Sequence, residues 1–266
     1  AEALNDLSDA VTNSSGVTIG IGTDALANDD GSANFNTALG YKAGEDVTSG
    51  TTGLFLGYYA GLNVTTAIGT IAVGSRAMGL GVTTGNYNTA IGYEAGYDLT
   101  SGTYNFFGGF RAGYNATTVS NTIGIGRNAF GSGVLTGDDN TAIGQNAGYD
   151  LTSGTDNNFM GRNSGYNATT ATNTVAIGRL AIGLGVATGD GNVAIGNQAG
   201  YDLTSGAFNV FMGRLAGGSA TTGSTNVFQG YQAGLNATSA SHTVAIGNAA
   251  IGLGILTGTD NTAIGR

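Results

Sequence analysis

The sequence predicts an all-β protein, a parallel β-solenoid of about 15 coils with 17–18 residues in each coil. Three observations predict it. A repeat fills the chain from about residue 17 to its end, every repeat is rich in Gly, Thr and Asn, and the apolar runs are only two to five residues long. These features disfavour helices and suit short strands between turns. Residues 1–16 lack the repeat and are predicted to be an N-terminal linker, so the repeat domain spans 17–266.

Each repeat contains a Gly, called the anchor here, that ends a segment similar to Asn-Thr-Ala-Ile-Gly. The residue before the anchor is aliphatic or Met in 13 of 15 repeats, and the residue three after it is Ala in 13 of 14, with Ser164 as the exception. A column limited to Ala and Ser predicts close approach of another backbone, and a Gly column predicts the same or a positive φ. The predicted structural anchors include Gly92, Ala95, Gly109, Ala112, Gly126, Ala129, Gly144, Ala147, Gly178, Ala181, Gly196 and Ala199.

Three repeat types alternate and make a 52-residue super-repeat. One type carries the turn Tyr-Asp-Leu-Thr-Ser-Gly, one has Phe two before the anchor (Phe107), and one has a large apolar residue four after it (Met78). An extra Phe-type repeat near 213–230 breaks this order. Such an insertion keeps the faces aligned only if each repeat is a complete coil. We therefore interpret 17–18 residues as one coil and 52 as a duplication length.

Stacking of coils predicts ladders of identical side chains. Asn recurs four before the anchor, and stacked Asn amides form hydrogen-bonded ladders in cross-β arrays. A thin coil with Ala and Gly at many inward positions encloses little apolar volume. We therefore expect the Phe, Met and Ile columns to need a partner surface, and the chain to form an intertwined or side-by-side homotrimer. The Asn positions are Asn88, Asn105, Asn140, Asn157, Asn192 and Asn209.

The segments Asn88-Thr-Ala-Ile-Gly92 and Thr174-Val-Ala-Ile-Gly178 resemble the repeat of trimeric autotransporter adhesin heads. Longer strings such as Gly85-Asn-Tyr-Asn-Thr-Ala-Ile-Gly-Tyr-Glu-Ala-Gly96 look still more like bacteriophage tail-fibre shafts. The resemblance covers residues 17–266, although these coils are longer than is usual in adhesin heads. It implies a left-handed parallel β-roll with three chains packed side by side.

Composition excludes several function classes. The chain has 8 Lys+Arg against 17 Asp+Glu, and its net charge of −9 disfavours nucleic acid as a partner. There is no Cys for disulfides or thiolate metal sites. No run of 18 apolar residues occurs, so no membrane insertion by a helix is expected.

Candidate catalytic and metal-binding residues are few. His242 is the only histidine and stands where sister coils have Asn121 and Asn173, which indicates a turn residue. Asp138 and Asp139 are the weak candidates for a metal site, but sister turns do not repeat the pair. We therefore expect no enzyme, no cofactor and no metal.

For the other recurring side chains, the sequence favours structural roles. All eight basic residues lie one or two after an anchor, and four Asp lie six after it, which predicts pairing between neighbouring coils or chains. Asn-x-Ser/Thr sequences recur in one turn column, and Tyr columns could stack on sugars or cover the coil edges. The Asn sites are Asn13, Asn63, Asn115, Asn167 and Asn236; the other two sets are Asp46, Asp98, Asp150 and Asp202, and Tyr97, Tyr149, Tyr201, Tyr114 and Tyr166.

The predicted function is a non-enzymatic fibre segment for attachment to a host or a surface, either a phage tail-fibre shaft or an adhesin head. It would lie outside the cell or on a virion, bind copies of itself, and present a surface to a host glycan or protein. Three alternatives stay open: an ice-binding solenoid with Thr-rich turns, a polysaccharide-cleaving β-helix, and a self-assembling extracellular filament. The chain lacks an initiator Met and stops one residue past an anchor, so we expect a fragment or processed product.

Overall fold

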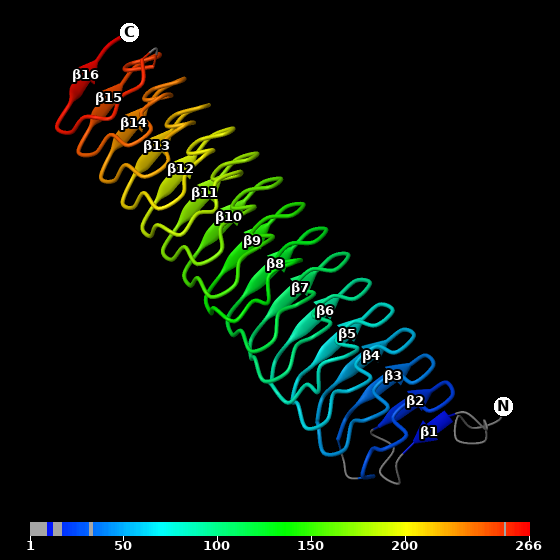
Figure 1. Cartoon of the computed structure of the whole chain (residues 1–266). Helices are drawn as coiled ribbons and strands as arrows, with labels where there is room; N and C mark the ends of the chain where they lie inside the picture. The colour runs from blue at the N-terminus through cyan, green and yellow to red at the C-terminus, as the bar shows by residue number, and fades with distance from the viewer. Residues whose placement is uncertain (1–9, 13–17, 32–33, 253) are drawn as a thin grey trace. The chain divides into compact units, whose positions relative to one another are not determined.

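The structure, a computed structural model, describes residues 10–12, 18–31, 34–252 and 254–266. It is all-β, as predicted, and these residues form two compact units that divide after Asn128. The described residues contain no helix that could cross a membrane. Within each unit the strands lie side by side in chain order (Figure 1).

One three-residue strand stands at the end of each repeat, directly before the anchor Gly. Within each unit, neighbouring strands from β2 onward pair in parallel, one coil apart, so the predicted parallel solenoid with one coil per 17–18 residues is confirmed. The first unit holds β1 (Ala10–Thr12), β2 (Ile19–Ile21), β3 (Thr37–Leu39), β4 (Leu54–Leu56), β5 (Ile71–Val73), β6 (Thr89–Ile91), β7 (Phe106–Gly108) and β8 (Ile123–Ile125). The second holds β9 (Thr141–Ile143), β10 (Asn158–Met160), β11 (Val175–Ile177), β12 (Val193–Ile195), β13 (Val210–Met212), β14 (Val227–Gln229), β15 (Val244–Ile246) and β16 (Thr262–Ile264).

Part of the predicted linker is a strand. Ala10–Thr12 forms β1, which pairs antiparallel with β2 and is the one antiparallel strand among those described. The other predicted linker residues, 1–9 and 13–16, lie outside the described residues.

Besides the anchor itself, the turns of each coil use positive φ at three fixed places, five before the anchor and two and four after it. At the position two after the anchor the residue is never Gly, and residues as different as Lys42, Glu94 and Leu180 all adopt φ between 51° and 58° there. Left-handed backbone is uncommon for such residues. It recurs here because hydrogen bonds to both neighbouring coils hold each turn.

The anchor column must be Gly for both of the predicted reasons. Gly92 has φ 136°, and a Cβ on it would lie 2.5 Å from the carbonyl oxygen of Gly109 in the next coil. Three residues later, Ala95 is fully buried and donates its N–H to the Gly92 carbonyl. All six predicted Ala positions are fully buried, and all six predicted Gly positions have φ between 125° and 138°.

Each coil interior is filled by alternating large and small side chains. The middle residue of a strand points inward, and Phe107, Phe159 and Phe211 are fully buried there. Of the coils with a small middle residue, one type instead buries a large residue four after the anchor, such as Met78 or Phe130. The expectation that the Phe column needs a partner surface was therefore wrong, because the chain's own coils enclose these rings.

This alternation shows that side-chain packing, in addition to duplication, accounts for the 52-residue super-repeat. At Gly96 a Cβ would meet Phe107 of the next coil and Met78 of the preceding one. A coil with Ala in the middle of its strand and Gly at this position, as at Gly96 and Gly148, thus receives side chains from both neighbours. The extra Phe-type repeat is a full coil, in which Phe211 and Phe228 stack with centroids 5.4 Å apart.

The predicted Asn ladder is present in both units. Asn105 Nδ2 donates to Asn88 Oδ1 at 3.0 Å, and Asn157 Nδ2 donates to Asn140 Oδ1 at the same distance. All six predicted Asn side chains are buried. Buried amides of this kind are stabilising only when they are paired, so the ladder stabilises the stacking of neighbouring coils.

Candidate functional site: the outer face of the sheet

The first and third residues of each strand point away from the coil interior and form what we call the outer face. The residue directly before the anchor is apolar in most coils and exposed, by 43% in Ile91, 37% in Ile177 and 40% in Ile195. The residue three before the anchor adds a second column, which includes Phe106 and Ile123. Within each unit these two columns run along every parallel strand.

An apolar surface that recurs on successive strands differs from isolated exposed apolar residues. Soluble monomers rarely expose large contiguous apolar patches, and such patches mark interaction sites. The chemistry of this face is that of a contact surface, because it offers aliphatic and aromatic carbon with no ionisable group in either column.

Two further columns border the outer face. The upstream edge is the column five before the anchor, and the downstream edge is the column one after it. Both columns lie two positions along the chain from an outward-pointing strand residue. Tyr87 and Tyr93, which come from the two edges of one coil, are both exposed. The apolar face is therefore framed by side chains that differ from coil to coil.

Aromatic rings stack along the edges of the first unit. Tyr87 stacks on Tyr104 in the upstream edge, and Tyr93 on Phe110 in the downstream edge, with centroids 5.2 and 5.3 Å apart. The predicted Tyr columns behave in the same way, since Tyr97 with Tyr114 and Tyr149 with Tyr166 stack within 9° of parallel. Rings that stack on each other cover each other's faces, which favours the role of covering coil edges over stacking on sugars.

The ion pairs of the described residues use Glu rather than the predicted Asp column. Glu94 is nearly buried and accepts from Arg111 Nε at 2.8 Å, with Arg76 Nη1 at 3.6 Å on its other side. Lys42 pairs with Glu45 at 2.9 Å. These pairs do link neighbouring coils at Glu94, but the Asp residues six after the anchor take part in none of them.

Three of those Asp residues are instead half-buried beside the following coil. Burial raises the pKa of the Asp98, Asp150 and Asp202 carboxyls above the ordinary value of 3.8, because desolvation disfavours the charged form. Hydrogen bonds with Ser132 and Ser219 oppose this rise in the pKa of Asp150 and Asp202.

Asp138 and Asp139 occupy an exposed turn. Asp139 has φ 60° in the upstream edge. Side chains equivalent to Asp138 have a structural role in sister coils, since Asn86 Oδ1 accepts the N–H of Ile68 and Asp190 Oδ1 accepts that of Thr172. The described part of the chain contains no group of three or more His, Asp or Glu side chains placed to hold a metal ion.

The remaining candidates lie in turns. His242 is exposed with φ 52°, in the same slot as Asn121 and Asn173, as predicted. Asn167 Nδ2 donates to the Leu184 carbonyl, Asn63 makes the equivalent bond to Leu80, and Asn236 donates to the Gly252 carbonyl, which supports turn chemistry for this column. Asn13 lies outside the described residues.

Several Thr side chains of the Thr-rich turns are engaged within the chain. Thr100, Thr152 and Thr204 each donate a hydroxyl to a carbonyl of the next coil at 2.9–3.0 Å. These hydroxyls therefore stabilise coil stacking.

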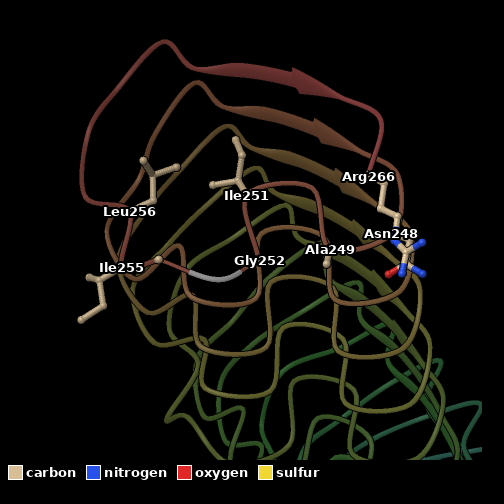
Figure 2. A pocket seen from close by; sticks show the side chains of 8 residues that line it. Asn248, Ala249, Ile251, Gly252, Ile255, Leu256 and Arg266 are labelled. Carbon is tan, nitrogen blue, oxygen red and sulfur yellow. The ribbon is translucent and has the colours of Figure 1, made fainter.

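A concavity of about 580 Å³ lies over the last coil of the second unit (Figure 2). Ile251 and Leu256 project over it, whereas Ile255 points away. Arg266 supplies the one ionisable side chain of its lining. This lining is mostly aliphatic and offers no acid–base pair.

Comparisons with known proteins give no relative. No protein-family model matches the chain, and no curated protein and no solved structure is significantly similar to it.

Proposed function

We propose that this chain is a non-enzymatic structural segment of an attachment fibre, as in a phage tail-fibre shaft or an adhesin head, and that it works as a homotrimer. It would act outside the cell or on a virion, where the assembled fibre contacts a glycan or protein of a host. The observation that carries this proposal is the apolar outer face, which recurs on strand after strand in each unit.

The spacing of the face favours a second copy as its partner. Apolar side chains recur once per coil, about 4.8 Å apart along the stack. A surface that matches such rows over a whole unit needs the same spacing, and another copy of this chain has it. Burying the face against two copies would add apolar contact coil by coil, in the way that repeat proteins gain stability.

Solution mass tests the proposal. Light scattering should give three times the chain mass of 26.2 kDa. Ile143→Asp with Ile195→Asp places two charges on the outer face and should give the mass of one chain. Ser153→Asp with Ser205→Asp is the matched control, because it places the same charges in exposed turns of the same two coils.

A wild-type protein with the mass of one chain overturns the trimer. A trimer that survives the Ile variants as well as the Ser variants would show that the outer face is not the contact surface. Circular dichroism on all three proteins checks that the variants keep the strand signal.

A further inference from the structure

A concavity of about 210 Å³ lies in the turns of the first unit, and three successive coils line it. The coil that follows β5 contributes Gly79, the preceding coil contributes Leu62, and the next coil contributes Tyr97. We call this concavity the Gly79 slot. Pockets for drug-sized ligands measure about 300–1,000 Å³, so the slot has room for one ring rather than for a larger molecule.

The Gly79 slot exists because a column of side chains is interrupted. Five after the anchor, the flanking coils carry Leu62 and Tyr97, and Tyr97 stacks on Tyr114 with centroids 5.1 Å apart. Gly79 holds this position between Leu62 and Tyr97, and a Cβ on it would lie 2.9 Å from the Arg76 carbonyl oxygen. The local backbone therefore excludes a side chain here, and the column lacks one layer.

The missing layer leaves one face of Tyr97 toward the slot, because Tyr114 stacks on the opposite face at an interplanar angle of 5°. Successive coils are about 4.8 Å apart, so Leu62 and Tyr97 are roughly 9.6 Å apart along the stack. A flat ring with carbon contacts of about 3.5–4.0 Å on each side fills only about 7–8 Å of this distance. A pyranose ring is puckered and carries hydrogens and hydroxyls above and below its mean plane, so it reaches both walls.

The charge of the slot favours an acidic sugar. Arg76 is exposed and carries the one formal charge among the side chains that line the slot. It lies 3.6 Å from one oxygen of Glu94, whose other oxygen accepts Arg111 Nε at 2.8 Å. Two guanidinium groups thus share one carboxylate. Because a guanidinium has five N–H donors, Arg76 can bind a second carboxylate beside Glu94.

We infer that the Gly79 slot binds a pyranose ring that carries a carboxylate, with a face of the sugar on Tyr97 and the carboxylate paired with Arg76. This inference rests on the proposed function and deepens it, because it names the class of host glycan that the fibre contacts and the residues that bind it.

The second unit offers an internal comparison. Gly183 interrupts the same column between Tyr166 and Tyr201, but Leu180 stands where the first unit has Arg76. The backbone is the same at both positions, since φ is 58° at Leu180 and 57° at Arg76. The gap at Gly183 therefore lacks the cation and should not prefer an acidic sugar.

Saturation-transfer NMR titrations of the full chain test the inference. The probes are methyl glucuronide, its neutral counterpart methyl glucoside, and benzoate as a flat acid. The protein should bind the glucuronide about tenfold more tightly than the glucoside, because the carboxylate adds a charge-assisted hydrogen bond. It should bind benzoate more weakly than the glucuronide, because a flat ring contacts only one wall.

Variants locate the site. Arg76→Gln should abolish the preference for the glucuronide, and Tyr97→Ala should abolish binding of both sugars. Lys42→Gln is the matched control, because it removes the same charge from the same column at a residue outside the slot lining, and it should keep the preference. Leu180→Arg added to Arg76→Gln should restore the preference by placing the cation beside Gly183.

Three results overturn the inference: no binding of the glucuronide, equal affinity for the glucuronide and the glucoside, or benzoate bound as tightly as the glucuronide. Each of them leaves the trimer standing, because solution mass and the outer-face variants test the trimer separately. A protein with the mass of one chain that prefers the glucuronide would overturn the trimer and support the slot.

Discussion

Asn209 donates Nδ2 to Asn192 Oδ1 in the preceding coil at 3.0 Å, and its own Oδ1 accepts Nδ2 of Asn226 in the next coil at 2.9 Å. One side chain thus links three coils, and all three amides are buried.

Replacing Asn209 with Ala should lower the free energy of unfolding by about 2–4 kcal/mol, because buried groups of Asn192 and Asn226 lose their partners. Urea denaturation measures the loss. Thr222→Ala is the control, since this Thr is exposed and should change the free energy by less than about 0.5 kcal/mol. Equal effects of the two substitutions would contradict a stabilising ladder.

Gly196→Ala should be among the most damaging single substitutions in the second unit. Its φ is 138°, and a Cβ would lie 2.6 Å from the Gly213 carbonyl oxygen. We expect a loss of about 3–5 kcal/mol. Gly254→Ala makes the same chemical change where no atom lies within 4 Å of the new Cβ, and thermal melts should show it to be tolerated.

Asp98→Asn should stabilise the protein at neutral pH and not in acid. The folded-state pKa of Asp98 is raised above 3.8, so the fold favours the neutral carboxyl and loses that stability as pH rises through the folded pKa. The two proteins should therefore unfold alike below pH 3.8 and diverge as the pH rises above it. Denaturation of both proteins across this pH range would contradict this explanation if their free energies of unfolding differed by the same amount at every pH.

Glu94 should couple Arg76 and Arg111. Either Arg→Ala substitution leaves the nearly buried Glu94 carboxylate one cationic partner, whereas the double substitution leaves it none. The double variant should lose more stability than the sum of the single variants, by about 1–2 kcal/mol. Arg111→Ala combined with Lys42→Ala is the additive control, because Lys42 pairs with a different carboxylate.

Much of the coil could be predicted because repetition exposes what each column tolerates. Gly92, Ala95 and Asn105 each stand in columns whose composition follows from backbone approach, burial and amide pairing, and all three have the predicted environment. The positive φ two after the anchor left no such signal, since Lys42 and Leu180 occupy it alike.

The charged pairs could not be predicted for a related reason. Arg76, Arg111 and Glu94 share the column two after the anchor, so stacking brings them together, whereas the Asp column lies in a different turn. The spacing along the sequence predicted pairing between coils or chains for all eight basic residues, whereas the ion pairs between coils among the described residues involve Arg76 and Arg111. The sequence also did not predict that three successive coils share their interior volume, which follows from the position of Gly96 between Met78 and Phe107.

Strand β1 has a consequence for aggregation. A row of parallel strands is a template on which foreign chains can add, and templated growth of this kind leads to amyloid. Because β1 reverses direction and pairs Val11 with Gly20, it occupies the backbone N–H and C=O groups that β2 would otherwise offer to an incoming strand. The first unit thereby carries its own aggregation guard, built from a three-residue strand.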